Sequence, residues 1–219
     1  MGSWEMSGMR RRTTLFAAAV MAAGFASGVM AADAPKAPAP VTYKEFIWGD
    51  AKAKVTVIEY ASLTCPHCAD FANTVFPDIK KNYIDTGKIR FVFRDYPLDG
   101  LGMAAAALAR CAPEGRGAKM IELMYKNQLE WARAASPIEP LKGYAALAGM
   151  SATDVDACLK NEALLKEIKD IQSKASSLYG VQSTPTFYVN DEKVEGLAAG
   201  KAGYDAITKV LDKQVAKAK

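Results

Sequence analysis

The sequence predicts an α/β fold, and the evidence is the order in which strand-like and helical segments follow one another. Residues 55–60 and 89–94 are short apolar runs with the composition of buried strands. Residues 100–179 have a helical pattern instead, and residues 186–189 are again typical of a strand. A strand–helix–strand unit, a helical block, and then a hairpin with a closing helix predict one sheet with helices packed on it.

The first strand–helix unit contains two interruptions of its pattern. Residues 55–60 are apolar at nearly every position, which predicts a central, buried strand, but Glu59 breaks the run. The next helix starts at Cys65 and continues through the apolar residues around Ile79. Pro77 lies inside it, and we expect a kink or a break there because proline lacks the N–H that an interior helical position donates.

Capping residues divide the helical block. Ser151 followed by Asp154 matches a capping box, which predicts the start of a short helix that ends near Lys160. Asn161 is expected to cap the next helix, which Gly180 ends. The remaining expected elements are helices at 103–111 and 119–134, strands at 186–189 and 193–195, and a closing helix at 204–215.

The amino-terminal segment has the pattern of an export signal. Three arginines at positions 10–12 precede an apolar, Ala-rich run at 15–29, and we expect cleavage near Ala31. Residues 1–31 are therefore predicted to be a signal peptide and residues 32–42 a flexible lead-in; an uncleaved membrane anchor is the alternative. The net charge of +4 falls to +2 without residues 1–31, and the charges are interspersed, which argues against a nucleic-acid partner.

All four cysteines follow the predicted signal, so export would place them where disulfides persist. Cys65 and Cys68 are three positions apart at a predicted helix start. The free N–H groups and the dipole of the helix stabilise a thiolate at the first position, which lowers its pKa and makes it a better leaving group. Four cysteines allow three pairings; this spacing favours Cys65 with Cys68 and leaves Cys111 and Cys158 for each other.

Two motifs give the chain a resemblance to a known family. The first is Cys65-Pro66-His67-Cys68, and the second is Ser183-Thr184-Pro185-Thr186-Phe187 far downstream. Together they resemble the DsbA family of bacterial periplasmic thiol oxidases, over nearly all of the chain after the signal. The resemblance implies a thioredoxin fold with an inserted all-helical subdomain. The implied boundaries are 43–98 and 180–219 for the thioredoxin-like domain and 99–179 for the helical subdomain.

The resemblance also implies a role for each residue of the first motif. Cys65 would be the exposed nucleophilic sulfur, and Cys68, one turn further on and more buried, would re-form or resolve the disulfide. Pro66 fixes φ where a backbone N–H would have no partner. His67 is expected to favour the Cys65 thiolate through a positive or dipolar contact.

Two positions outside the motif are implied to support it. The pair Thr184-Pro185 matches a cis-proline position, whose loop faces the cysteines and offers its backbone to an extended substrate. Glu59 lies in a buried strand, which should raise its pKa, and the resemblance implies that it exchanges a proton with Cys68. Lys88 or Arg90 on the next strand is expected to pair with it; a Glu59 side chain at a strand edge in water is the alternative.

Cys111 and Cys158 lie on separate predicted helices. A second, structural disulfide between them resembles what some alphaproteobacterial DsbA relatives carry, and two free buried thiols are the alternative. The disulfide would close a loop with 46 intervening residues. In the chain-entropy account such a loop is worth about 4 kcal/mol of stability.

These features predict a monomeric periplasmic dithiol oxidase that introduces disulfides into exported proteins with free thiols, without a metal or an organic cofactor. A quinone-linked membrane oxidase of the DsbB type is implied as the reoxidising partner by the resemblance alone. A disulfide isomerase or reductase on the same fold is the first alternative. The second is a copper-handling protein that uses Cys65, Cys68 and His67, the single histidine of the chain.

Overall fold

The computed structural model describes residues 41–195 and 200–218, so the predicted signal peptide and most of the predicted lead-in lie outside the described residues. The strands form one five-stranded sheet in the order β1-β3-β2-β4-β5. β2 pairs parallel with β3 and antiparallel with β4, so the strand that precedes the cysteine motif is central. The strands are β1 (Phe46–Trp48), β2 (Val55–Ala61), β3 (Ile89–Asp95), β4 (Thr186–Val189) and β5 (Glu192–Lys193).

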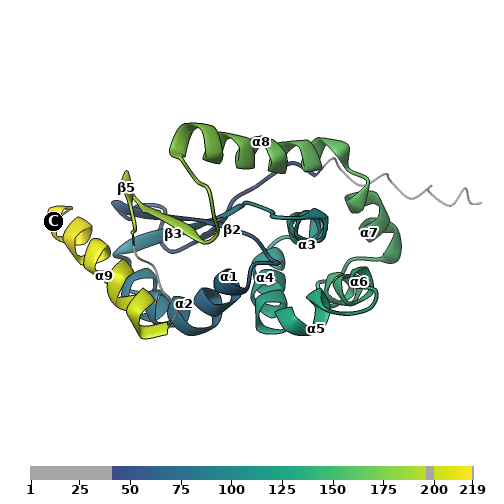
Figure 1. Ribbon diagram of the computed structural model, residues 1–219, viewed down its shortest axis with the longest axis horizontal. Coiled ribbons are helices and arrows are strands. Elements are labelled where there is room, and N and C mark those ends of the chain that lie inside the picture. The colour runs from purple at the N-terminus through teal and green to yellow at the C-terminus, as the bar shows by residue number, and fades with distance from the viewer. Residues whose placement is uncertain (1–40, 196–199, 219) are drawn as a thin grey trace, which may run out of the picture. The chain divides into compact units, whose positions relative to one another are not determined.

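Helices cover both faces of the sheet, which confirms the predicted α/β class (Figure 1). The long helix α8 crosses one face, while α1, α2 and α9 lie on the other, and α3 to α7 lie beside the sheet. The chain makes α3 to α8 between β3 and β4. The α-helices are α1 (Pro66–Asp70), α2 (Phe76–Ile79), α3 (Gly100–Cys111), α4 (Gly117–Lys126), α5 (Gln128–Ala132), α6 (Ile138–Leu147), α7 (Ala152–Leu159), α8 (Glu162–Tyr179) and α9 (Gly200–Lys217).

The side chains of β2 alternate between two apolar clusters. Val55 and Val57 pack with the helices that follow the motif and with α9, whereas Tyr60 packs toward α8 and Ile58 lies against the same cluster. Because strand side chains alternate with a period of two, Glu59 points to the same side of the sheet as Val57. The single acidic residue of β2 is thus directed into the interior.

The helix that begins with the motif changes its winding before the proline. π-helical segments η1 (Phe71–Val75) and η2 (Lys80–Ile84) flank α2, and Pro77 stands in the first turn of α2. At Pro77 the hydrogen-bond pattern therefore changes within a continuous helical run, and the chain does not leave the helix there.

The predicted capping residues of the helical block are confirmed. Ser151 and Asp154 form a capping box at the start of α7, and the Asn161 side chain accepts a hydrogen bond from the N–H of Leu164. Gly180 ends α8 in the left-handed region, with φ 66°.

Four elements differ from the prediction. The strand expected at 193–195 is β5, which ends at Lys193. The single helix expected at 119–134 is two helices, because Asn127, with φ −111° and ψ 23°, ends α4 before α5 begins. β1 was not expected, since three residues are too few to display a period. α6 was not expected individually, because Pro140 and Gly143 lie within it and both weaken a helical pattern.

In the described part of the chain, no helix has both the length and the apolar composition that crossing a lipid bilayer requires.

Candidate active site

The cysteine motif lies at the junction between β2 and the helical run that follows it. Cys65 is the N-cap of α1, with φ −79° and ψ 120°, and Pro66 is the first residue of the helix. The carbonyl of Cys65 accepts a hydrogen bond from the N–H of Ala69 at 3.2 Å. Cys68 therefore lies one helical turn along, and both cysteines are free thiols in this structure.

The structure buries Cys65, so the expectation of an exposed sulfur is wrong for this state of the protein. Only 3% of Cys65 and 0% of Cys68 is exposed. The Cys65 thiol donates a hydrogen bond to the carbonyl of Thr184 at 3.3 Å. The Thr184–Pro185 peptide bond is cis, and Thr184 comes from a segment 119 positions further along the chain that lies against the sulfur.

The two thiols have opposite pKa shifts. A hydrogen bond from the Cys68 side chain is the main cause that lowers the pKa of Cys65 to about 5, and contacts with Thr184 and with backbone N–H groups add to it against the effect of burial. Burial raises the pKa of Cys68 well above its usual value, and the neighbouring Cys65 and Glu59 raise it further. At neutral pH this arrangement favours a thiolate on Cys65 and a thiol on Cys68.

The Thr184 hydroxyl has a partner in only one protonation state of Cys65. Its oxygen is buried and has no hydrogen-bond partner among the described residues while the Cys65 thiol donates to the Thr184 carbonyl. When Cys65 loses its proton, the sulfur becomes an acceptor and the hydroxyl is able to donate to it, which contributes to the lowered pKa of Cys65.

Glu59 lies behind the cysteines and is 3% exposed. Burial raises its pKa well above the usual value, and the negative charge of Cys65 raises it further. Its Oε1 atom has no hydrogen-bond partner in the described part of the chain. Burial and the Cys65 thiolate therefore both favour the neutral form of the Glu59 carboxyl, through its raised pKa.

Among the described residues, neither Lys88 nor Arg90, the predicted basic partners of Glu59, forms an ion pair with it. The Lys88 ammonium donates to the carbonyl of Asn82, and Arg90 donates to the hydroxyl of Thr56. The parallel register is the reason, because it places Arg90 beside Thr56 and a phenylalanine, Phe93, beside Glu59.

The sequence that forms this site matches a known family. A family profile described as Thioredoxin matches residues 42–213. The chain belongs to the thioredoxin family.

Two curated relatives have names that refer to protein disulfides. A Rickettsia conorii protein named as a protein-disulfide oxidoreductase is 34% identical over 181 residues, which cover 79% of this chain and 62% of the relative. The disulfide bond formation protein D of Bacillus subtilis is 29% identical over 77% of this chain and 76% of that protein. The chain thus spans less than two thirds of the length of the Rickettsia relative.

The crystal structure of Wolbachia pipientis alpha-DsbA1 superposes on this thioredoxin-family chain with a TM-score of 0.70. It is 30% identical and covers 83% of this chain and 94% of the Wolbachia chain. The thioredoxin fold with inserted helices, which the two motifs predict, is therefore the fold of this DsbA-like protein.

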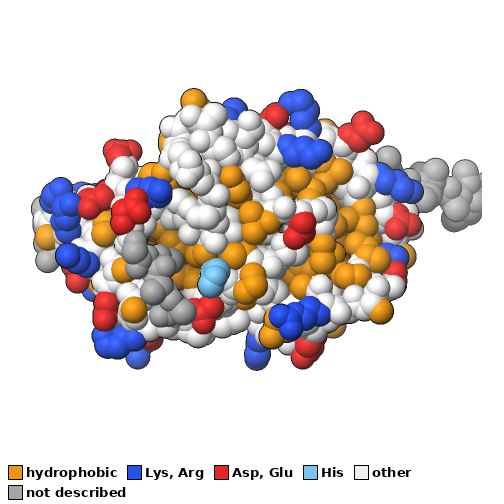
Figure 2. Space-filling model, viewed as in Figure 1, with side chains coloured by type: hydrophobic (Ala, Val, Ile, Leu, Met, Phe, Trp, Pro, Cys, Tyr) orange, Lys and Arg blue, Asp and Glu red, His pale blue; other side chains and the backbone are white. Residues whose placement is uncertain are grey.

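His67 contributes to the thioredoxin-family motif through its backbone. Its N–H is among the groups that lower the pKa of Cys65. The side chain is exposed, and Figure 2 shows the single histidine in pale blue at the surface, next to a gathering of apolar side chains. No contact between the His67 side chain and Cys65 is found among the described residues, so the expected role of this side chain stays a prediction.

Gln128, which the sequence analysis did not single out, holds the loop that carries Cys65. Its Nε2 donates to the carbonyl of Leu63 at 2.8 Å and to the carbonyl of Cys65 at 2.9 Å. The side chain is 5% exposed and comes from α5, more than sixty positions away. From the sequence Gln128 is one polar residue inside the helix expected at 119–134, so neither its burial nor its target could be read from its position.

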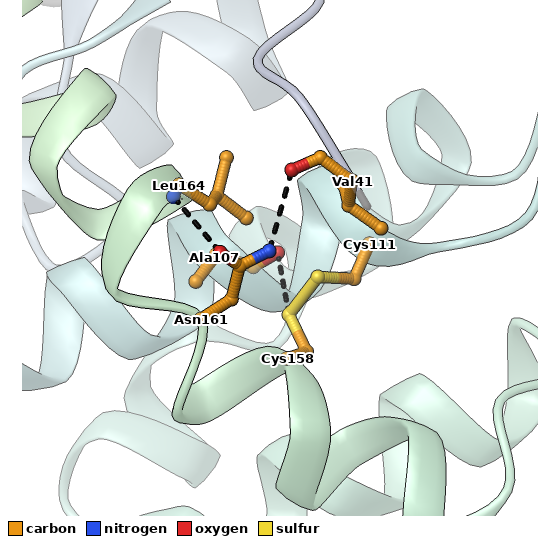
Figure 3. Close-up of a disulfide and its surroundings, with 6 residues drawn as sticks. All are labelled: Val41, Ala107, Cys111, Cys158, Asn161 and Leu164. Atoms are coloured by element: carbon orange, nitrogen blue, oxygen red, sulfur yellow. Dashed lines mark hydrogen bonds between the residues drawn. A yellow bond between two sulfur atoms is a disulfide. The ribbon is translucent and has the colours of Figure 1, made fainter. Parts of the chain in front are cut away.

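Cys111 and Cys158 form a disulfide with a Cα–Cα distance of 6.1 Å (Figure 3). It joins the end of α3 to the end of α7. Beside it, the Asn161 side chain that caps α8 also donates to the carbonyl of Val41 at 3.3 Å, so the last residues of the predicted lead-in are held against the helices.

Within residues 41–195 and 200–218, no group of three or more His, Cys, Asp or Glu side chains is arranged to hold a metal ion. The two cysteines of the motif lack a third protein ligand there, so no described contact favours the copper-handling alternative.

Proposed function

We propose that this protein is an exported dithiol oxidase that transfers the Cys65–Cys68 disulfide to other exported proteins. The observation that carries the proposal is the asymmetry of the two thiols, with the pKa of Cys65 lowered to about 5 and that of Cys68 raised. A stabilised Cys65 thiolate favours the reduced pair over the disulfide, so the disulfide is a strong oxidant.

The reaction begins from the Cys65–Cys68 disulfide. A substrate thiolate attacks the Cys65 sulfur, the bond to Cys68 breaks, and Cys68 leaves with the electron pair while a mixed disulfide forms. A second substrate thiolate then attacks the substrate sulfur of the mixed disulfide and releases Cys65 as a thiolate. Two electrons pass from the substrate to the pair, and the substrate gains one disulfide.

The two leaving sulfurs have different fates. Cys68 is buried and its thiolate is unfavourable, so it takes a proton as it leaves, and the neutral carboxyl of Glu59 is the proton donor beside it. Cys65 needs no proton at neutral pH because its pKa is about 5. Glu59 then regains its proton from solvent, which returns the site to its starting charge.

Substrate binding is assigned to the surface around the motif. Thr184 and Pro185 precede the first residue of β4, and an extended substrate lies against their backbone. A hollow of about 370 Å³ is lined by Pro66 and by residues of α4 and α5. Leu129 lines it and is 60% exposed, which offers an apolar contact to unfolded chains.

In this proposal the protein acts in the periplasm. The predicted signal at residues 1–31 directs export, and the compartment outside the cytoplasm allows disulfides to persist. Reoxidation is assigned to a quinone-linked membrane oxidase of the DsbB type. The protein acts as a monomer on exported proteins with free thiols.

The test is the equilibrium of the Cys65–Cys68 pair with graded glutathione buffers, read by trapping the free thiols. The Cys111→Ser/Cys158→Ser variant is measured alongside, so that only the motif contributes thiols. An oxidase pair stays reduced until the buffer is strongly oxidising, and each shift of about 30 mV is a tenfold change in the equilibrium. A pair that stays oxidised in strongly reducing buffer contradicts the proposal and favours a reductase; efficient rearrangement of a wrongly paired substrate favours an isomerase.

A further inference from the structure

A cavity of about 330 Å³ lies between the sheet and the helices η1, α2 and α4, and Glu59 is the one residue of the proposed reaction that lines it. Aromatic residues are the largest group in its lining. Six rings contribute, from Trp48, Phe71, Phe76, Phe91, Phe93 and Tyr125. The volume is at the small end of the range for ligand sites, which suits a molecule with a single ring.

The aromatic lining is formed before any molecule enters. Phe76 packs edge-on against Trp48 and against Phe91, with ring centroids 5.6 Å and 4.9 Å apart. Phe71 stacks on Phe91 at 6.3 Å. Because the rings hold one another in place, little ordering accompanies the entry of a ligand.

One buried polar group opens onto this aromatic cavity. Glu59 lines it, is 3% exposed, and keeps Oε1 without a hydrogen-bond partner among the described residues. Burial raises the pKa of Glu59, so the group is a neutral carboxyl that both donates and accepts hydrogen bonds. A buried polar atom without a partner is costly, and a ligand that supplies the partner relieves that cost.

The charged groups at this cavity lie toward solvent. Glu122 and Lys126 line it and are exposed, and the Lys80 ammonium is 2.6 Å from the carboxylate of Asp85. No cationic side chain is among the buried residues of the lining, so a charged ligand would lose its water without gaining an ionic partner.

We propose that this cavity binds a small uncharged aromatic molecule that carries a hydroxyl group, with the ring among the aromatic side chains and the hydroxyl on the carboxyl of Glu59. A phenol is the simplest member of this class. Its hydroxyl both donates and accepts, and thereby matches the neutral carboxyl. The inference does not depend on the proposed thiol chemistry, because binding is measured without any exchange reaction.

The test is a titration of the isotope-labelled full chain with 4-methylphenol, followed by NMR. The indole N–H signal of Trp48 should move. The signal of Trp131 should not, because Trp131 is fully buried outside the cavity, where its Nε1 donates to the carbonyl of Met124. Toluene has the same ring without the hydroxyl and should bind at least about fivefold more weakly, as expected for one hydrogen bond to a buried group.

Two variants separate the cavity from a general affinity for aromatic molecules. Ala72 is a small, half-buried residue of the lining, and Ala72→Leu fills the space and should abolish binding. Ala163→Leu adds the same group on the exposed face of α8 and should leave binding unchanged. In Glu59→Leu, the preference for 4-methylphenol over toluene should disappear.

Three results overturn the inference. They are a Trp48 signal that does not move at millimolar 4-methylphenol, equal affinities of the wild-type chain for 4-methylphenol and toluene, and unchanged binding in Ala72→Leu. The comparison of the two molecules uses the wild-type chain only, so it decides the question even if a variant does not fold.

Discussion

The two cysteine pairs of this chain have the same side chains but differ in their separation along the chain and in their surroundings. Cys111 and Cys158 are joined across 46 intervening residues and link two helices, whereas Cys65 and Cys68 are thiols within one helical turn. A long closed loop constrains the unfolded chain strongly, and a loop of two residues hardly constrains it. The first pair is therefore suited to stability and the second to exchange. Separation along the chain governs the first property, and the hydrogen bonds that stabilise the Cys65 thiolate, chiefly the one from Cys68, govern the second.

The largest expected effect comes from removing the Cys65 sulfur, which tests whether only the Cys65–Cys68 pair carries out exchange. Cys65→Ser should reduce disulfide transfer to a thiol substrate to the rate without protein, because the Cys65–Cys68 disulfide, whose Cys65 sulfur the substrate thiolate attacks, cannot form. The measurement is the oxidation of a dithiol peptide followed by mass spectrometry. The matched control, Cys111→Ser/Cys158→Ser, should retain the transfer rate within a few-fold. Transfer that survives in Cys65→Ser would falsify the assignment of roles.

The converse experiment removes the structural pair. Cys111→Ala/Cys158→Ala should lower the free energy of unfolding by about 4 kcal/mol, because the unfolded chain regains the entropy of a long loop. Urea denaturation at neutral pH, with Cys65 and Cys68 alkylated in both proteins, measures the difference. An equal loss on reopening the two-residue loop of Cys65–Cys68 would remove the distinction between the pairs.

A third prediction concerns Gln128, whose side chain holds the loop that carries Cys65. Gln128→Leu removes the Gln128 donor from the carbonyl of Leu63 and leaves the carbonyl of Cys65 with only the N–H of Ala69, which should cost about 1–3 kcal/mol of unfolding free energy. Gln172→Leu is the matched control, because its Nε2 donates to one carbonyl, that of Pro97. Urea denaturation should rank the loss in Gln128→Leu above that in Gln172→Leu, and the reverse ranking argues against this role of Gln128.

A further expected effect is a dependence of stability on pH, which the reactive pair has and the disulfide lacks. The pKa of Cys65 is about 5 in the folded protein, below that of an unfolded thiol, so the folded state binds fewer protons between about pH 5 and pH 8.5. The stability that this thiolate contributes is fully present above about pH 8.5 and is lost as the pH falls toward 5, with a slope of about 1.4 kcal/mol per pH unit. Disulfide sulfurs do not titrate in this range.

Ultraviolet absorbance of the thiolate measures this titration directly. The signal of the protein reduced at Cys65–Cys68 should reach half of its height near pH 5 and should be absent in Cys65→Ser. A midpoint near 8.5 would mean that the helix N-terminus and Cys68 do not stabilise the thiolate.

Local features of the site were predictable from sequence, and features that depend on distant segments were not. Cys65 at a helix start and Glu59 in a buried strand follow from the residues next to them, and the structure has both. The burial of Cys65 by Thr184, and the hold of Gln128 on its carbonyl, join segments 119 and 63 positions apart. No local pattern encodes such contacts, since they depend on how the helical block folds back onto the sheet.

The wrong prediction of a basic partner for Glu59 shows that contacts between neighbouring strands are also hard to predict from local sequence. Lys88 and Arg90 lie on the adjacent strand, as predicted, but pairing in a sheet depends on register. The parallel alignment places Thr56 beside Arg90, three residues from Glu59. A shift of this size is invisible in the composition of either strand.

Arg110, the residue before Cys111, sets a practical limit on shortening the chain. Its guanidinium is buried, 2.6 Å from the carboxylate of Asp95, and lies over the rings of Tyr43 and Phe46 at 4.3 Å and 3.9 Å. An expression boundary placed after Phe46 would delete neither β2 nor any helix. It would nevertheless expose one side of this ion pair to water and remove both rings, so secondary-structure content alone is a poor guide to where this protein may be cut.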